Sequence, residues 1–434
     1  MFIAKSPYNT AMVNKPNPPP APIFDNLDSL RDRHQVTLVA DSIDQLFDRD
    51  PVDGASDDYR AAVQFLKSYD GSTATFNAYR RELERLLQWS WHISHQTVRS
   101  LKRDDIVEYI EFLRNPPKSW IGTKNVARFK QKSGQRQPNP AWRPFVQVVS
   151  KAERRRGIEP DKSKYRPSSA SVKATFAVLS SFFDYLVQDS YVTANPVALI
   201  RQKSKYLRRE QNQAPVRRLS ELQWDYVLET AELMADDDPD EHERTLFIMT
   251  ALFTMYLRIS ELVSDERSEP VMGDFKRDRD GNWWLHVIGK GNKLRTVAVS
   301  DAMLKALKRY RLSRDQSALP TPNESEPMVA KTRGNGSIAS TRHIRRIVQD
   351  CFDRAYERMR SDGLEDDALD LRESTVHWLR HTGISEDVRL RPQQHVRDDA
   401  GHGSMVTTSR YIESDERERH ASGRGKPARF FDDG

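Results

Sequence analysis

Cysteine and long apolar runs are nearly absent from this sequence. The single cysteine, Cys351, excludes a disulfide within the chain and any metal site built from several cysteines, and it fits a reducing cytoplasm. No run of about 18 apolar residues is present, so we expect no membrane-spanning helix. Residues 1–22 are rich in proline and asparagine and lack the apolar segment of a secretory signal. Together these absences predict a protein of the cytoplasm.

Charge of both signs is present, but the basic residues are clustered. Hydrophobic residues make up 37% and charged residues 30% of the 434 positions, a balance typical of two or three polar globular domains. The net charge is only +6, yet ten Lys or Arg and one acid lie between Lys124 and Arg156. Five more, without any acid, lie between Arg201 and Arg209. Such stretches attract a polyanion by releasing its counterions, although a solvated surface is the alternative.

Aromatic residues in and beside the first basic stretch favour a surface that docks on another molecule; they are Trp120, Phe129, Trp142 and Phe145. We therefore predict that side chains of both basic stretches bind DNA. These are Lys124, Arg128, Lys130, Arg154, Arg155, Arg156, Arg201, Lys203, Lys205, Arg208 and Arg209.

The first half of the chain is predicted to be helical. Residues 1–55 are expected to form a partly disordered arm, with a short helix around Ser42–Phe47. In residues 56–200, apolar side chains at helical spacing predict an all-helical domain with a basic insertion at about 118–166. Its helices are Thr75–Trp89, Asp104–Leu113 with Asp104 or Asp105 as the cap, and Ser171–Val187. Residues 201–217 are predicted to be a basic interdomain linker.

A second domain is predicted over residues 218–412. Thr245–Leu257 is apolar on nearly every side and predicts a buried helix that ends at Arg258. Trp283–Ile288 and Leu294–Val299 flank a Gly-Lys-Gly-Asn turn and predict a β-hairpin, to which Val271–Phe275 adds a third strand. Further helices are predicted over Asp301–Leu312, Thr341–Met359, Val376–Val388 and about Gln394–Ala400.

Two cationic side chains in this domain are candidates for binding an anion. Arg258 follows a strongly apolar segment, so its guanidinium needs an anionic partner. That partner is either Glu261, in a structural ion pair, or a phosphate, whose oxygens suit the planar fork. Lys290 lies on the hairpin turn, where an ordinary exposed lysine is the alternative, and the nearby glycines lack the spacing of a P-loop.

The segment from His377 to Tyr411 is the richest in chemistry. His377 and His381 lie four residues apart, but the acid of a zinc-binding His-Glu-x-x-His motif is missing. Arg380 shares a helix face with His377, and a fixed positive charge beside a proton donor suits a phosphoryl transition state. His402 lies between two glycines, and Tyr411 follows nine residues later. A phenol with an ordinary pKa near 10 becomes a useful nucleophile only when neighbouring cations lower that value.

Taken together, these segments resemble the tyrosine recombinase (phage integrase) family. Leu257–Leu262 is similar to the family's first arginine motif, Gly289–Lys293 to its hairpin lysine and His377–Thr382 to its second box. Gly401–Tyr411 is similar to the third box and its tyrosine. The matches follow the family's order at near-family intervals, and they cover about Arg218–Ile412.

The resemblance implies a fold class that is mostly α with a small antiparallel β-sheet. Residues 56–200 are expected to form a helical DNA core-binding domain and residues 218–412 a mixed α/β catalytic domain. The implied catalytic residues are Arg258, Lys290, His377, Arg380, His402 and Tyr411, with Glu261 in support.

In the mechanism that the resemblance implies, Tyr411 attacks a DNA phosphate and leaves a 3′-phosphotyrosyl bond and a free 5′-hydroxyl. The two arginines neutralise the non-bridging oxygens, and His402 donates a hydrogen bond. His377 assists proton transfer from the nucleophile, and Lys290 protonates the leaving 5′-oxygen. No metal and no other cofactor is expected.

The implied partner is double-stranded DNA that carries specific recombination sites, bound by a homotetramer in the nucleoid. An accessory DNA-bending or helper protein is a further expected partner. Residues 413–434 include Arg429-Phe430-Phe431, which we expect to pack on a neighbouring protomer unless the tail is disordered. The long N-terminal half favours a mobile-element enzyme for integration, excision or cointegrate resolution. A type IB topoisomerase-like enzyme and a DNA-binding protein with a vestigial active site are the alternatives.

Overall fold

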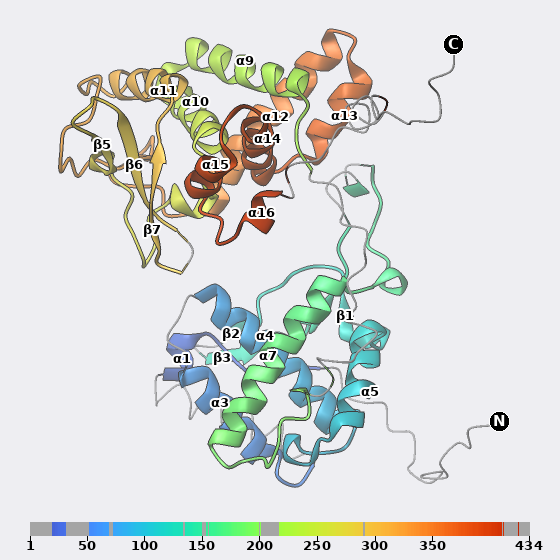
Figure 1. Cartoon of the computed structure of the whole chain (residues 1–434). Helices are drawn as coiled ribbons and strands as arrows, with labels where there is room; N and C mark the ends of the chain where they lie inside the picture. Colours follow the sequence, from blue (N-terminus) through green and yellow to red (C-terminus); the bar gives the residue numbers. More distant parts are fainter. Residues whose placement is uncertain are drawn as a thin grey trace, which may run out of the picture. The chain divides into compact units, whose positions relative to one another are not determined.

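The computed structural model describes residues 20–31, 52–68, 73–132, 135–149, 153–154, 156–198, 200, 217–289, 291–409, 411 and 424. The chain forms two compact units, Met1–Asn212 and Gln213–Gly434. Both units consist mainly of helices, and the second contains a three-stranded antiparallel sheet (Figure 1). The predicted fold class, mostly α with a small antiparallel sheet, is therefore confirmed.

The first unit packs amphipathic helices around one apolar core. Its described helices are α1 Leu27–Arg31, α3 Ala55–Ser68, α4 Thr73–His92, α5 Arg103–Arg114 and α7 Ser169–Gln188. The last three confirm the predicted helices, while α1 and α3 were not predicted. Helix α1 lies in the arm predicted over residues 1–55, where Phe24 and Leu30 are buried in the core of the unit. The predicted N-cap of α5, Asp104 or Asp105, was wrong, because the N-cap is Lys102. Asp105 lies in the first turn, and its carboxylate accepts a hydrogen bond from the backbone N–H of Lys102.

Helix α7 is apolar enough, by length and composition, to cross a membrane. Half of its most apolar window is nevertheless buried, and its Phe182, Phe183 and Leu186 lie in the core of the unit. Burial on that scale is what a core helix shows.

The basic insertion between α5 and α7 contains short strands. These are β1 Ile121–Gly122, which pairs in parallel with β4 Phe145–Val146, and the hairpin of β2 Phe129–Lys132 with β3 Gln135–Pro138. Its aromatic residues do not form a docking surface, contrary to the prediction. These four side chains are at most 6% exposed. Trp120 and Phe145 pack in the core with the helices, while the rings of Trp142 and Phe129 lie against Arg128 and Arg136.

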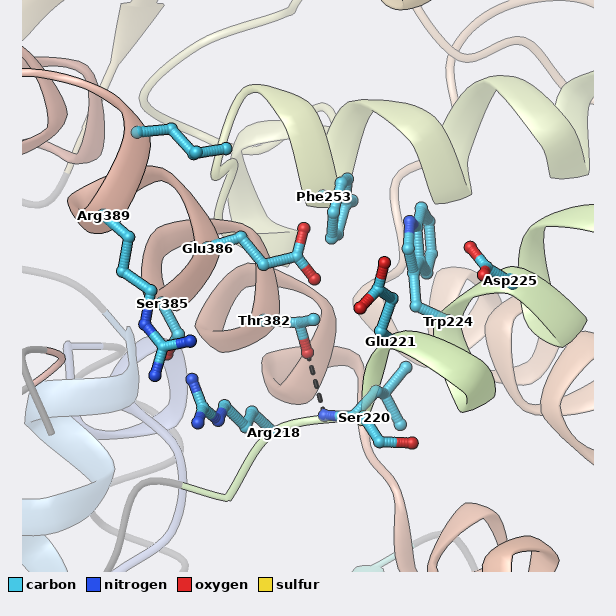
Figure 2. A pocket seen from close by; sticks show the side chains of 12 residues that line it. Arg218, Ser220, Glu221, Trp224, Asp225, Phe253, Thr382, Ser385, Glu386 and Arg389 are labelled. Atoms are coloured by element: carbon cyan, nitrogen blue, oxygen red, sulfur yellow. Dashed lines mark hydrogen bonds between the residues drawn. The ribbon is translucent and has the colours of Figure 1, made fainter. Parts of the chain in front are cut away.

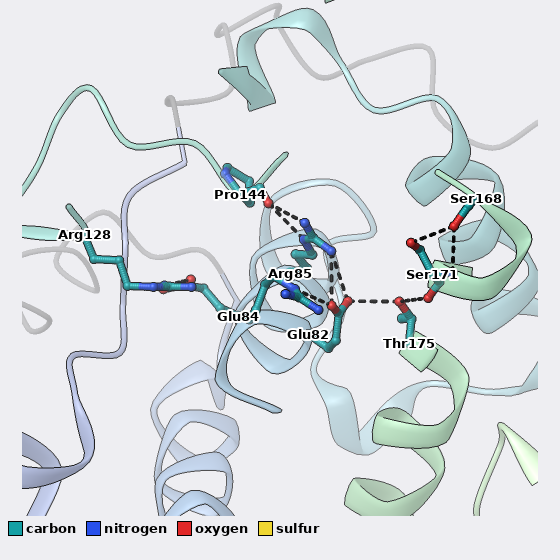
Figure 3. A network of polar contacts seen from close by, with 9 residues as sticks. Glu82, Glu84, Arg85, Arg128, Pro144, Ser168, Ser171 and Thr175 are labelled. Carbon is teal, nitrogen blue, oxygen red and sulfur yellow. Dashed lines mark hydrogen bonds and ion pairs between the residues drawn. The ribbon is translucent and has the colours of Figure 1, made fainter. Parts of the chain in front are cut away.

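Two buried carboxylates of α4, together with Arg85, fasten the insertion and α7 to that helix (Figure 3). Glu82 accepts hydrogen bonds from Arg85 and from Thr175 of α7, and Arg85 also donates to the carbonyl of Pro144 at 2.7 Å. Glu84 forms an ion pair with Arg128. The prediction that Arg128 binds phosphate is therefore corrected, because its guanidinium already neutralises a buried acid.

The second unit has a helical core with the sheet along one side. Its helices are α9 Glu221–Asp237, α10 Pro239–Thr254, α11 Asp301–Leu312, α12 Thr341–Ser361, α13 Glu365–Glu373, α14 Val376–Leu390, α15 Gln393–Ala400 and α16 Met405–Ser409. Helices α11, α12, α14 and α15 confirm the predicted helices to within a few residues, while α9 and α13 were not predicted. The strands are β5 Phe275–Arg277, β6 Trp283–Ile288 and β7 Leu294–Ala298, in the order β5-β6-β7, so the predicted hairpin is confirmed.

Two predicted element boundaries in this unit were wrong. Helix α10 ends at Thr254, because Tyr256 adopts a left-handed backbone with φ of +49°. Arg258 therefore caps a short 3₁₀ turn instead of ending the helix. The third strand begins at Phe275, because Met272–Asp274 form a 3₁₀ turn whose Asp274 carboxylate accepts from the N–H of Val271.

Several predictions fall on residues outside the described set. These are the helix around Ser42–Phe47, the linker up to residue 216, and the tail beyond Tyr411 apart from Arg424.

A buried acid in the first unit provides a test of this packing. The Asp58 carboxylate is 1% exposed and accepts from Trp91 Nε1, the Val98 N–H and the Tyr191 hydroxyl at 2.8–2.9 Å. We expect Asp58→Ala to lower the free energy of unfolding by about 3 kcal/mol, because three buried donors lose their shared acceptor. Urea unfolding followed by tryptophan fluorescence measures this loss. The matched control is exposed Asp57→Ala, for which we expect a change within about 0.5 kcal/mol; equal losses in both variants would contradict this account.

Candidate active site

Three segments that lie far apart in the sequence meet around Tyr411. The Tyr411 side chain is 9% exposed and packs in a small cluster with Tyr256, Ile384, Val388, Val396 and Ala400. Its hydroxyl lies 2.8 Å from Nδ1 of His381. Its ring stacks on that of His402, with the ring centroids 5.8 Å apart and the planes 13° apart. The phenol is thus held between two imidazoles.

Arg380 brings a buried cation to the same place. It is 5% exposed, and its guanidinium donates to the carbonyl of Tyr256 and, at 2.6 Å, to that of Ala400. No carboxylate forms an ion pair with it among the described residues. Burial, followed by the charge of Arg258, lowers the pKa of Arg380 to about 10, so the side chain stays charged at neutral pH. A buried charge that lacks a counterion favours the binding of an anion.

The position of Arg380 depends on how tightly α14 packs. A Cβ atom at Gly383 would overlap the carbonyl oxygen of Phe253, so only glycine lets α14 approach the end of α10 this closely. The left-handed Tyr256 follows that end and turns its carbonyl to Arg380. Helix packing therefore aligns the two arginine-bearing segments.

Arg258 is held by Glu261, and Glu261 is held by Arg295. The Glu261 carboxylate accepts from the backbone N–H and the guanidinium of Arg258 at 2.7 and 3.1 Å. Both terminal nitrogens of Arg295 reach the same carboxylate at 2.7 Å. Burial alone raises the pKa of Glu261, but the hydrogen bonds and charges of the two arginines outweigh it and lower that pKa. The side chain of Arg258 remains 28% exposed, so part of it faces the pocket.

A second carboxylate, Asp399, joins the sheet to the segment that carries His402. It accepts from the Ala298 N–H at 3.2 Å and from Arg391 at 2.6 Å, and its backbone carbonyl accepts from Arg295 Nε at 3.0 Å. Arg391 also donates to the hydroxyl of Tyr256 at 2.9 Å. These bonds fix β7, α15 and the end of α10 against one another.

The histidines of the site are held neutral by their surroundings. Burial, then His377 and Arg380, lowers the pKa of His381 to about 4, and burial, then Arg380 and Arg258, does the same for His402. Burial and nearby arginines also lower the pKa of His377. Neutral rings have a lone pair, so each can accept a hydrogen bond or a proton.

The hydrogen bonds of His402 assign its tautomer. Its Nε2 lies 3.4 Å from the guanidinium of Arg380, which can only donate, and its Nδ1 lies 3.0 Å from the Thr408 hydroxyl. The ring proton therefore lies on Nδ1. The sequence predicts that His402 donates a hydrogen bond to the phosphate. For Nε2 to be the donor, His402 must change tautomer or take up a second proton.

The predicted site residues divide into those that meet and those that cannot be placed. The predicted residues that meet in this pocket are Arg258, Glu261, Arg380, His402 and Tyr411. His377 lies one helical turn from His381, with the ring centroids 6.3 Å apart. Lys290 lies outside the described residues. Four of the predicted DNA-binding residues are exposed, namely Lys124, Lys130, Arg154 and Arg156. Six others lie outside the described residues: Arg155, Arg201, Lys203, Lys205, Arg208 and Arg209.

Four residues of the site were missed from the sequence: His381, Arg295, Arg391 and Asp399. His381 was visible in the second box, but its four-residue spacing from His377 was considered only for zinc. Arg295 stands 34 positions from Glu261 along the chain, and no local pattern pairs them. A basic residue within a short, largely apolar strand was the available signal.

A hollow of about 600 Å³ on the same unit is distinct from this pocket (Figure 2). Trp224 and Phe253 stack along it with centroids 4.0 Å apart. The Thr382 hydroxyl accepts from the Leu219 N–H at 2.9 Å, which ties the start of the unit to α14 two residues beyond Arg380. None of the predicted catalytic residues that the structure describes lines this hollow.

The lowered histidine pKa values make a measurable prediction. In the unfolded chain these two imidazoles take up a proton at the ordinary pKa of 6.5, whereas in the folded chain they do so only near 4. The neutral rings therefore contribute fully to the stability of the fold above pH 6.5. This contribution is lost as the pH falls from 6.5 towards 4. NMR titration of the ring resonances, assigned with His381→Gln and His402→Gln, is expected to give midpoints near 4. Midpoints near 6.5 would contradict the burial described above.

Comparisons with known proteins agree with this geometry. The model of the phage integrase family matches residues 217–418. A tyrosine recombinase XerC of Caldanaerobacter subterraneus subsp. tengcongensis is 25% identical over 246 residues, which are 55% of this chain and 58% of that protein. A tyrosine recombinase XerC of Corynebacterium efficiens is 30% identical over 181 residues, which are 41% of this chain and 48% of that protein.

A solved structure shares the fold. The crystal structure of the XerH site-specific recombinase bound to a palindromic difH substrate is 14% identical, with a TM-score of 0.50, and the match covers 82% of this chain and 81% of that chain. The chain spans about half the length of the curated relatives it matches. The resemblance seen in the sequence motifs is confirmed: residues 217–418 match the model of the phage integrase family, and the curated relatives that this chain resembles are tyrosine recombinases.

Proposed function

We propose that this protein is a site-specific DNA recombinase that cleaves and rejoins DNA through a 3′-phosphotyrosyl intermediate. The observation that carries the proposal is the pocket in which the Tyr411 hydroxyl, the His402 ring and the buried Arg380 guanidinium meet. A phenol beside an unneutralised cation is suited to attack on a phosphodiester, because the transition state carries more negative charge than the ground state.

The proposed chemistry assigns the phosphate to the two arginines. Arg380 supplies a fixed charge at the base of the pocket, and the exposed part of Arg258 reaches the second non-bridging oxygen. Glu261 keeps Arg258 in place with the help of Arg295. His402 donates to the phosphate after its tautomer changes, and Lys290 protonates the 5′-oxygen that leaves. Bond energy is kept in the phosphotyrosine, so a 5′-hydroxyl can reseal the strand without ATP or metal.

We further propose that the first unit binds the DNA backbone. A groove of about 750 Å³ on this unit lies between α4, α7 and the insertion. Its rim carries Arg143, Lys164 and Arg166, and the last two are exposed. The buried ion pairs of Figure 3 hold the groove's walls together, so these cations sit on a rigid surface that suits a backbone of phosphates.

The proposed partner is duplex DNA with specific recombination sites, bound by a homotetramer in the cytoplasm, at the nucleoid. The long N-terminal half favours an enzyme of a mobile element, acting in integration, excision or cointegrate resolution. The tail with Phe430 and Phe431, which is expected to pack on a neighbour, lies outside the described residues. That contact and the helper protein therefore stay predictions.

Two alternatives are distinguishable. A type IB topoisomerase-like enzyme would relax supercoiled DNA of arbitrary sequence as a monomer. A DNA-binding protein with a vestigial site would bind its target but form no covalent adduct. The neutral histidines and the hydrogen-bonded phenol favour a working site over a vestigial one.

The central test uses a nicked suicide duplex that carries the cognate site. Wild-type protein is expected to form an SDS-resistant adduct, and Tyr411→Phe is expected to form none, because the attacking oxygen is missing. The matched control is Tyr226→Phe on α9, whose hydroxyl bonds to exposed Asp362, and this variant is expected to react like wild type. An adduct that persists in Tyr411→Phe would show that another residue is the nucleophile.

The groove makes its own prediction. Lys164→Ala with Arg166→Ala is expected to weaken DNA binding and to reduce the slope of log affinity against log salt by about 0.9 for each phosphate that the protein no longer neutralises. The control replaces exposed Arg60 on α3, which pairs with Asp57, by alanine. Fluorescence anisotropy at several salt concentrations measures both slopes, and an unchanged slope in the double variant would exclude the groove.

A further inference from the structure

The Tyr411 hydroxyl has a specific polar partner, and it is not the histidine that the motifs suggested. The sequence predicts that His377 assists proton transfer from the nucleophile. In the structure, the hydroxyl lies 2.8 Å from Nδ1 of His381, and the two rings are 5.5 Å apart. His377 lies one turn earlier on α14, with its ring centroid 6.3 Å from that of His381. Burial, followed by the charges of Arg380, Arg345 and Arg258, lowers its pKa.

We propose that His381 is a catalytic residue that takes the hydroxyl proton of Tyr411 during cleavage and returns it during rejoining. This inference rests on the proposed recombinase function. Three observations support it: the hydrogen bond itself, the helix that carries the imidazole directly after Arg380, and the stacking of His402 on the phenol ring, which fixes the orientation of the ring and of its C–O bond.

The protonation state of His381 suits this role. Burial, His377 and Arg380 lower its pKa and keep the ring neutral at physiological pH, and with its proton on Nε2 the ring accepts at Nδ1. A phosphodiester bound at Arg380 brings negative charge that opposes one of these effects, so the ring becomes more basic when DNA is in place. Proton transfer is then coupled to the presence of the substrate.

The step balances in atoms and charge. The Tyr411 oxygen forms a bond to phosphorus while its O–H bond breaks, and the proton goes to Nδ1 of His381. The bond between phosphorus and the 5′-oxygen breaks, and that oxygen takes a proton from a separate donor, for which Lys290 is the candidate. In rejoining, the 5′-hydroxyl attacks the phosphotyrosine, its proton returns to that donor, and His381 reprotonates the phenolate.

The alternative is that His381 only positions the phenol. Two variants separate the roles. In His381→Asn the side-chain oxygen can replace Nδ1 as a hydrogen-bond acceptor but cannot hold a proton, whereas His381→Ala removes both. If His381 is a base, both variants are expected to lose about 10²-fold or more in the single-turnover rate of adduct formation, and both lose the acidic limb of the pH–rate profile. Added imidazole is expected to restore part of the rate of the alanine variant.

A duplex with a sulfur atom in place of the bridging 5′-oxygen shows which proton transfer a variant has lost, that from the nucleophile or that to the leaving group. Because a thiolate leaves without protonation, this substrate is expected to rescue Lys290→Ala but neither His381 variant. Rescue of His381→Ala by sulfur, or a wild-type rate and pH profile in His381→Asn, would overturn the proposal. Circular dichroism and DNA affinity check that the variants fold. If the wild-type protein formed no Tyr411 adduct at all, the proposed function would fail, which is a different outcome from a working enzyme that does not need His381.

Discussion

A guanidinium buried without a carboxylate partner determines the electrostatics of the candidate site in the second unit. Arg380 is enclosed by protein, yet its described partners are two backbone carbonyls and an imidazole. Carbonyl dipoles partly compensate the lost hydration but leave the net charge in place. The pocket is therefore electrostatically incomplete until an anion arrives. Because the two carbonyls belong to Tyr256 and Ala400, the same cation also joins the segments that carry Arg258 and His402.

The buried carboxylates of the site bind the arginine side chains and hold them in position. Glu261 and Asp399 are each nearly buried, and each bonds to groups from two or more segments. Arg295 contacts both, through the side chain of Glu261 and the backbone of Asp399. This arrangement fixes the position of Arg258 and leaves part of its guanidinium accessible. Rigid cations need little reorganisation when charge develops on the phosphate, and such preorganisation is a main source of catalytic rate.

The second feature of the site is the protonation state of its histidines. Burial, followed by the positive charge of neighbouring side chains, lowers the pKa of His381 and His402, so the imidazoles stay neutral and do not add to the repulsion among cations. A neutral imidazole beside the phenol is then available as a proton acceptor. The placement of His381 directly after Arg380 gives one turn of α14 two proposed roles, anion binding and nucleophile activation.

The sequence by itself determined the mostly helical class, the β-hairpin, the bounds of α11 and the residues of the arginine, histidine and tyrosine motifs. These features depend on local periodicity or on short motifs, which a linear chain displays directly. It did not determine that α10 ends at Thr254, because that boundary depends on the left-handed Tyr256, whose hydroxyl bonds to Asp387 and Arg391 far along the chain.

Only the tertiary structure decided which partners the site residues have. Arg295 and Glu261 lie on a strand and a turn that meet through packing, so the ion pair that holds Arg258 has no local signature. The same is true of the aromatic residues of the insertion, whose pattern suggests a docking surface but which the fold buries. The choice between His377 and His381 also belongs to the fold. Both lie on one helix four residues apart, and only the approach of a segment 30 residues away brings the Tyr411 hydroxyl to one of them.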